Sequence, residues 1–277
     1  MMQPYAKGFG GLARLDETLD AFWMGMRRYN VTYHNDMHCL DVAQMTFIVL
    51  CSEDLDAIGI RLKLRPLEYL SVLIAALCHD YAHDGFNNGY HVKTESSRFH
   101  LHGADAVQEK YHFAEAFKII ERTKLLCGLV PEDQATFRRL MLGCILSTDM
   151  SKHNDVLKNV QEMMLQIRSD QHELVTDDMS ADEVQERKEQ LLHLVVHSSD
   201  ISFLTRPMHV QQEWAYLLFE EFFHQGDIER EKGLPVSFLC DRETVNVAKS
   251  QKPFLDFAVM PLFKVVSELS PSKDYLY

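Results

Sequence analysis

The sequence places an adjacent histidine–aspartate pair, His79-Asp80, directly after a nearly all-apolar run. The run at residues 70–77 is apolar almost all round, which is typical of a helix that is buried on every side. A charged Asp80 at the end of such a helix is costly unless it is paired or binds a metal. Imidazole and carboxylate groups are the ligands that zinc, manganese and iron take in proteins. We therefore predict a metal site here, with His83 close by because it follows His79 by four residues.

Two further segments carry the same kinds of side chain. His34 and His38 are four residues apart and share a face if this segment is helical, and His38 heads an apolar stripe and so points inward. Asp200 follows Val196 by four residues on a helical face that should be buried. Any one of these groups alone could be a satisfied polar group of the core. Together, buried aspartates and histidines without a nearby lysine or arginine in the sequence are hard to satisfy except around cations.

Helical periodicity runs through the whole chain, and strand alternation is almost absent. One apolar face repeats at intervals of three and four residues: Phe137, Leu140, Met141, Cys144, Ile145 and Thr148. The polar, acidic stretch at 177–183 is predicted to be a surface loop that runs into the start of a helix. Prolines and glycines are expected to separate the helices, at Pro66, Gly85, Gly103, Gly128, Pro207, Gly226, Pro235 and Pro261. The pattern predicts an all-α fold, with metal ligands that project inward from several helices.

Length and composition set limits on the function. The chain has 277 residues, 46% of them hydrophobic, and we expect residues 1–277 to form a single domain. A net charge of −13 disfavours unaided binding of nucleic acid or anionic membranes. Neither a membrane span nor a leader at residues 1–8 is indicated, so a cytoplasmic location is expected. The six cysteines are far apart and are predicted to be reduced thiols.

Several motifs, in their order along the chain, resemble those of class I 3′,5′-cyclic nucleotide phosphodiesterase catalytic domains. The His-Asp pair alone is shared by a wide superfamily of phosphohydrolases, whereas the full ordered set is specific. The resemblance covers roughly residues 22–268 and implies a compact multi-helix domain with a binuclear metal site in a deep pocket. The matching motifs are Tyr33-His34-Asn35-x-x-His38, His79-Asp80-x-x-His83-x-Gly85-x-x-Asn88, Thr148-Asp149-Met150-Ser151-Lys152-His153, His197-x-x-Asp200, Ser250-Gln251-x-x-Phe254 and the segment from Glu220 to Glu231.

The resemblance also implies two divalent metal ions. The positions that match the tight site, usually occupied by zinc, are His38, His79, Asp80 and Asp200. Asp80 would also bridge to a looser, mostly hydrated ion such as Mg²⁺ or Mn²⁺, in keeping with the ligand preferences of these ions. The positions that match holders of metal-bound waters and of the metal ligands are His83, Glu109, Thr148 and Asp149.

The same resemblance implies the chemistry. A hydroxide that bridges the two metals would attack the cyclic phosphorus in line with the departing 3′ oxygen. His34 occupies the position of the general acid that protonates this oxygen, and Glu221 matches the carboxylate that orients the ring and favours its charged form.

The base pocket follows the family pattern in part. Gln251 matches the glutamine that hydrogen-bonds the purine edge, and Phe254 and Leu218 match the pair that clamps the ring. The other positions expected around the base are Tyr33, Ile201, Phe203 and Trp214. Many relatives have asparagine where this chain has Phe203. One polar constraint on the base is therefore missing, and we expect both cAMP and cGMP to be accepted.

The leading prediction is metal-dependent hydrolysis of cyclic nucleotides to 5′-nucleoside monophosphates, which terminates cyclic nucleotide signals. One alternative is a His-Asp phosphohydrolase that acts on a non-cyclic nucleotide, although Gln251 and the acid motif at residues 33–35 count against it. The other is a catalytically dead relative that binds nucleotide or partners, although no ligand or acid is lost. The 32 residues before Tyr33 are few for this family, so we expect the chain to be a fragment whose regulatory domains lie elsewhere.

Overall fold

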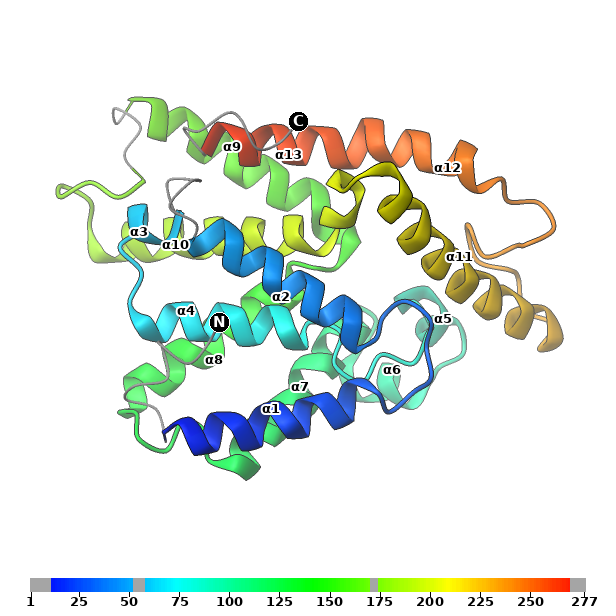
Figure 1. Cartoon of the computed structure of the whole chain (residues 1–277), viewed down its shortest axis with the longest axis horizontal. Coiled ribbons are helices and arrows are strands. Elements are labelled where there is room, and N and C mark those ends of the chain that lie inside the picture. The colour runs from blue at the N-terminus through cyan, green and yellow to red at the C-terminus, as the bar shows by residue number, and fades with distance from the viewer. Residues whose placement is uncertain (1–10, 52–57, 170–173, 270–277) are drawn as a thin grey trace.

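The computed structural model describes residues 11–51, 58–169 and 174–269, and within these ranges it contains helices and no strand. The all-α prediction is therefore confirmed for the described residues, while residues 1–8, where no leader was expected, lie outside them. The helices (Figure 1) are α1 (Leu12–Met26), α2 (Asp36–Cys51), α3 (Ile58–Arg61), α4 (Pro66–Cys78), α5 (Asn88–Lys93), α6 (Ser97–His102), α7 (Val107–Thr123), α8 (Pro131–Leu146), η3 (Met150–Lys152), α9 (His153–Ser169), α10 (Ala181–Asp200), η4 (Ser202–Thr205), α11 (Met208–Glu231), α12 (Val247–Phe254), η5 (Leu255–Val259) and α13 (Met260–Leu269).

Helix α4 forms the centre of the molecule, packed against α2, α8 and α10. Every residue from Leu67 to Cys78 is buried, as the apolar sequence predicts. The helix begins at Pro66, whose missing N–H is not needed in a first turn, and the carboxylate of Glu68 accepts a hydrogen bond of 2.7 Å from the N–H of Arg65. Because α4 ends at Cys78, the chain delivers the histidine–aspartate pair at the end of the core helix.

Helices α2 and α10 lie beside α4 and bring two more segments to the same end of the bundle (Figure 1). Helix α10 starts after the acidic loop, where Ser180 and Glu183 form a capping box, and it ends at Asp200. The predicted run of the acidic loop into a helix start is thus confirmed. Helix α11 crosses obliquely at this end of the bundle (Figure 1).

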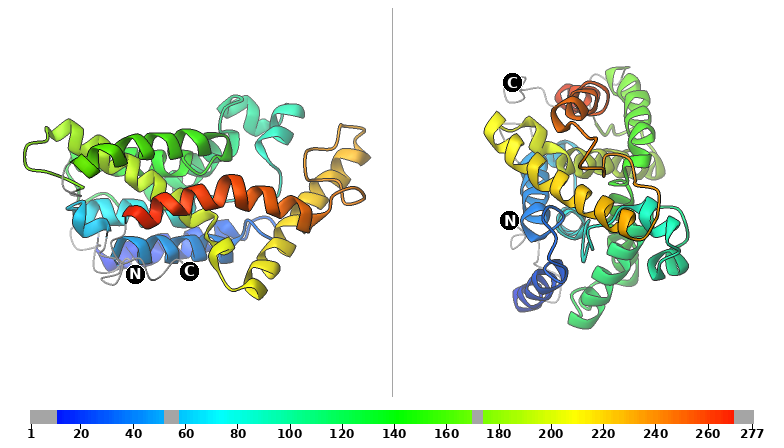
Figure 2. Two further views of the ribbon diagram at one scale, coloured as in Figure 1. Left: turned by 90° about the horizontal axis from the view of Figure 1, so that it is seen from above. Right: turned by 90° about the vertical axis from the view of Figure 1, so that its right-hand side faces the viewer.

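Two of the predicted helix breaks are wrong. Helix α11 runs straight through Gly226, where an added Cβ would lie 1.8 Å from the carbonyl oxygen of Cys240. This glycine allows close approach of a loop to the helix rather than ending the helix. Pro261 is the second residue of α13, which follows α12 through the π-helical turn η5, so the two helices lie nearly in line (Figure 2). A proline is tolerated in the first turn of a helix.

The described residues include all six cysteines and hold no disulfide, in agreement with the prediction of reduced thiols. Among the described helices, none has the length and apolar character required to cross a membrane.

Candidate metal centre and active site

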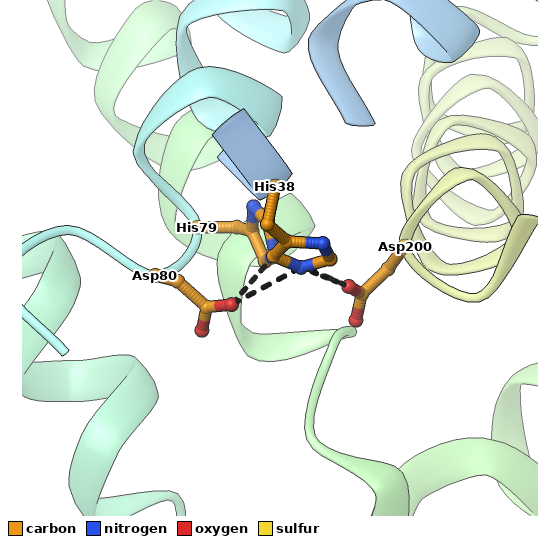
Figure 3. Close-up of side chains that lie close together, drawn as sticks. All are labelled: His38, His79, Asp80 and Asp200. Carbon is orange, nitrogen blue, oxygen red and sulfur yellow. Dashed lines mark hydrogen bonds and ion pairs between the residues drawn. The ribbon is translucent and has the colours of Figure 1, made fainter. Parts of the chain in front are cut away.

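Four side chains converge where α2, α4 and α10 meet (Figure 3). His38 comes from the start of α2, His79 and Asp80 directly follow α4, and Asp200 is the last residue of α10. The Nε2 atoms of His38 and His79 lie 3.2 Å apart, and Asp200 Oδ1 lies 3.0 Å from the first of them. One ligand atom from each residue lies within 4.8 Å of all the others. The structure therefore brings together the four residues that the sequence predicts as a metal site.

The donor set suits a cation. His79 Nδ1 lies 2.8 Å from the carbonyl oxygen of Ala76, to which it can only donate, so the Nε2 of a neutral His79 ring carries a lone pair. That lone pair faces the carboxylate of Asp80 and the ring of His38. Among the described residues, the ion-pair partners of both aspartates are histidines. A divalent cation would satisfy this cluster of lone pairs, and two imidazoles with two carboxylates are suitable ligands for zinc.

The electrostatics of the cluster agree with this interpretation. Burial alone would lower the pKa of His79, but the charges of Asp80 and Asp200 raise it well above its ordinary value. A proton on this ring therefore occupies the place that a metal ion would take, since metal ligands bind in their deprotonated form.

His34 lies in the turn before α2, next to the metal cluster. Because α2 begins at Asp36, His34 is not helical, so the condition under which His34 and His38 would share a helical face is not met. His34 Nδ1 lies instead 2.5 Å from Glu221 Oε1, and Glu221 Oε2 accepts hydrogen bonds from the backbone N–H groups of Tyr33 and His34, at 2.9 and 3.2 Å. Burial opposes the charged ring, yet Glu221 and then Asp80 raise the pKa of His34 to about 9. The ring is thus oriented and kept protonated.

Two more histidines lie against the cluster. His83 Nδ1 accepts a hydrogen bond of 3.0 Å from the N–H of Gly85. His112 Nδ1 donates to the carbonyl oxygen of Tyr81 at 2.7 Å, so its Nε2, 3.7 Å from Asp80 Oδ1, has no hydrogen-bond partner among the described residues. Burial lowers the pKa of His112 to about 4 and leaves a neutral ring. His112 is not among the predicted site residues, although its spacing of three residues from Glu109 on a helix was an available signal.

A cavity of about 310 Å³ opens beside Asp80. Asn88 Nδ2 donates to Glu109 there at 2.9 Å, and burial raises the pKa of Glu109 to about 7. Asp149 accepts a hydrogen bond of 2.9 Å from the N–H of Ser151. The residues that line the cavity include all the positions predicted to hold metal waters, the two aspartates of the metal cluster, and the acid with its partner: His34, Asp80, His83, Glu109, Thr148, Asp149, Asp200 and Glu221.

This arrangement agrees with a family match over most of the chain. The family model for 3'5'-cyclic nucleotide phosphodiesterases matches residues 33–277. The chain belongs to this family. The predicted family resemblance is confirmed, and the metal cluster, the His34–Glu221 pair and the cavity all lie within the matched residues.

Curated relatives of this phosphodiesterase family are similar along nearly the whole chain. The "Probable 3',5'-cyclic phosphodiesterase pde-1" of Caenorhabditis elegans is 34% identical over 260 residues, which is 93% of this chain and 36% of that protein. The Drosophila melanogaster "Dual specificity calcium/calmodulin-dependent 3',5'-cyclic nucleotide phosphodiesterase 1" is 36% identical over 88% of this chain and 27% of its own length. The chain thus spans about a third of the length of these relatives.

Two solved structures have the same fold as this chain. A structure of LmjPDEB1 in complex with IBMX has a TM-score of 0.80 and 29% identity, and the match covers 96% of this chain and 76% of that chain. The phosphodiesterase domain of the RhoPDE fusion protein from the choanoflagellate Salpingoeca rosetta has a TM-score of 0.79 at 24% identity, over 95% of this chain and 78% of that chain. The second likeness concerns the fold alone.

The positions predicted to bind the base are not among the residues that line the cavity. Tyr33, Phe203 and Trp214 form an aromatic cluster, with ring centroids 5.9 Å apart for Tyr33 and Phe203 and 5.7 Å for Tyr33 and Trp214. Phe203 is buried in η4. The others are the buried Ile201 and the half-buried Leu218, Gln251 and Phe254. None of these seven described residues lines the cavity, so their contacts with a base stay a prediction.

Proposed function

We propose that this chain is a metal-dependent 3′,5′-cyclic nucleotide phosphodiesterase that releases 5′-nucleoside monophosphates. One observation carries the proposal: a compact two-histidine, two-aspartate cluster lies beside a histidine that a buried carboxylate keeps protonated. Metal ions can activate water as the nucleophile of phosphodiester hydrolysis, and a proton donor in the same site can protonate the leaving oxygen. The family membership narrows the substrate to cyclic nucleotides.

The metal ligands would be His38, His79, Asp80 and Asp200, with zinc as the tightly held ion. A second, looser Mg²⁺ or Mn²⁺ would lie beside Asp80, in the part of the cavity lined by His83, Glu109, Thr148 and Asp149. When bound, such ions lower the pKa of water and neutralise phosphate charge. The carboxylate of Glu109, the hydroxyl group of Thr148 and backbone carbonyl groups of this wall would accept hydrogen bonds from metal-bound water.

The protein's own proton donor would be His34. A leaving 3′ oxygen needs a proton, and a general acid must be protonated at the working pH. The contact with Glu221 supports this role because its charge, followed by that of Asp80, raises the pKa of His34 to about 9. It also fixes the ring through Nδ1, which leaves Nε2 for the substrate.

Substrate choice belongs to the proposal as well. Gln251 would hydrogen-bond the purine, Phe254 and Leu218 would stack on it, and Tyr33, Ile201, Phe203 and Trp214 would surround it. A buried phenylalanine at position 203 adds no polar demand, which favours acceptance of both cAMP and cGMP. Residues 1–277 would form a single catalytic domain of a longer regulated protein, and its cytoplasmic location stays a prediction.

The direct test is hydrolysis of cAMP and cGMP by the purified protein, before and after chelation and with Zn²⁺, Mg²⁺ or Mn²⁺ added back. We expect 5′-monophosphate products, loss of activity with chelator and recovery with metals. Asp80→Ala should be inactive, whereas Asp16→Ala, which removes an exposed aspartate of α1, should match the wild type. Full activity in chelator, or hydrolysis of non-cyclic nucleotides alone, would contradict the proposal.

A further inference from the structure

A second set of buried polar groups lies on the same face of α11 as Glu221. Gln225 and Glu229 follow it at intervals of four residues, and all three side chains are buried, Glu229 completely. Replacing a buried polar pair with apolar residues of similar size is often neutral or stabilising, so such a chain is weak evidence for stability alone. The two distal residues, Gln225 and Glu229, instead form hydrogen bonds that lead to the cavity beside Asp80.

Glu229 fixes the direction of the Gln225 amide. The carboxylate of Glu229 accepts from Lys93 Nζ at 3.0 Å and from the N–H and hydroxyl of Ser237, both at 2.6 Å. It also faces Gln225 Nε2 at 3.1 Å. Because an ionised carboxylate only accepts hydrogen bonds, the Gln225 end that faces it must be the NH₂ group. The carbonyl oxygen of Gln225 is thereby turned the other way.

That oxygen holds the turn that precedes α5. Gln225 Oε1 accepts a hydrogen bond of 2.9 Å from the backbone N–H of Asn87. The next residue, Asn88, uses its side chain to accept from the N–H of Gln108 at 2.8 Å and to donate to Glu109 at 2.9 Å. Asn87, Asn88, Glu109 and Gln225 all line the cavity beside Asp80. The relay therefore ends at Glu109, the carboxylate proposed to hold metal water.

We propose that Gln225 is a positioning residue that sets the Asn87–Asn88 turn, and through it Glu109, at the looser metal position, with Glu229 acting as its orienting partner. This inference rests on the proposed function, since the wall that it positions belongs to the proposed metal pocket. The donor and acceptor pattern makes a specific demand: one member of the 225/229 pair must be a carboxylate and the other an amide.

The test exchanges the two side chains. Gln225→Glu places two carboxylates face to face, and Glu229→Gln lets the amide at position 225 turn around. The double variant Gln225→Glu/Glu229→Gln restores one carboxylate and one amide, and its carboxylate at position 225 still accepts from the N–H of Asn87. Lys93→Met is the matched control, because it removes an ion pair with Glu229 and leaves the relay from Gln225 to Asn87 intact.

The readout is Mn²⁺ affinity, measured by electron paramagnetic resonance without nucleotide, alongside Tm and the kcat and KM for cAMP. Each single variant should weaken Mn²⁺ binding by about 10–100-fold, as is usual when a partner of a metal site is lost. The double variant should recover most of that affinity, and Lys93→Met should lower Tm while it binds Mn²⁺ like the wild type.

The inference would be overturned if the Tm of the single variants falls as it does in Lys93→Met while their Mn²⁺ affinity stays at the wild-type level. A double variant that folds but binds Mn²⁺ more weakly than the wild type would also overturn the inference. This result would be decisive even if neither single variant folds. A wild-type protein that binds no Mn²⁺ and hydrolyses no cyclic nucleotide would instead refute the proposed function, so the two failures can be told apart.

Discussion

Glu221→Gln offers a sharp test of the proposed acid. The substitution keeps the size of the side chain and an oxygen that can accept from the N–H of Tyr33, but it removes the negative charge 2.5 Å from His34 Nδ1. A neighbouring opposite charge shifts a pKa by about 1–3 units. If loss of the charge lowers the pKa of His34 by about 2 units, which corresponds to about 2.7 kcal/mol, this pKa should fall from about 9 to roughly 7.

The sign of the effect on rate follows from the role of an acid. Activity is present while His34 is protonated and is lost as the pH rises through its pKa, so a lower pKa moves the alkaline limb of the profile to lower pH. Near pH 8, the protonated fraction should drop from about 0.9 to about 0.1, a loss of roughly tenfold in kcat/KM. Near pH 6 the loss from this cause should nearly vanish.

The assay is kcat/KM for cAMP from about pH 5.5 to 10 at saturating metal. Glu220→Gln is the matched control, because it makes the same change of charge on the adjacent residue of α11, outside the contact with His34. An alkaline limb that stays in place in Glu221→Gln, or a loss of equal size at every pH, would refute the reasoning that Glu221 acts through the charge of His34.

Three further predictions follow from the same structure. Asp200→Ala should abolish both metal loading and turnover, and its Tm should be lower than that of the metal-loaded wild type, because ions that bind the native state stabilise it. Normal zinc content of this variant by elemental analysis would contradict the ligand assignment. Phe203→Asn should change the ratio of kcat/KM for cAMP and cGMP without changing metal content, and an unchanged ratio would show that Phe203 does not face the base. Gly226→Ala should destabilise the protein by about 1–3 kcal/mol or more in denaturant unfolding, since its Cβ would meet the carbonyl oxygen of Cys240 at 1.8 Å; wild-type stability would mean that the loop moves away freely.

Local patterns in the sequence were sufficient to predict the helices that carry the ligands. The apolar run of α4 and the four-residue spacing that ends at Asp200 depend on burial and periodicity, which are properties of neighbouring residues. Periodicity gave only a wider set of inward histidines and aspartates, and the family resemblance predicted which four of them meet at the metal cluster.

Features that depend on contacts between distant segments could not be predicted in this way. Gly226 resembles a helix end in the sequence, and only the approach of the loop at Cys240 explains it. His34 lies outside α2 because the side chain of Asn35 caps the helix by accepting from the N–H groups of Met37 and His38. Its contact with Glu221, 187 residues away, could not be predicted from local patterns. The helical spacing of His112 from Glu109 indicates a shared face, but its approach to Asp80 joins two separate segments and could not be predicted from that spacing.

The burial of α4 has a consequence for the lifetime of a bound ion. The ligands are attached at the ends of α2, α4 and α10, three helices that pack on one another in the core. Complete separation of the ligands would require these helices to part, and core helices open only in the highest-energy fluctuations of a native protein. An ion held in this cluster would therefore exchange more slowly than an ion held mainly by the cavity wall, which includes the loop at Asn87 and Asn88.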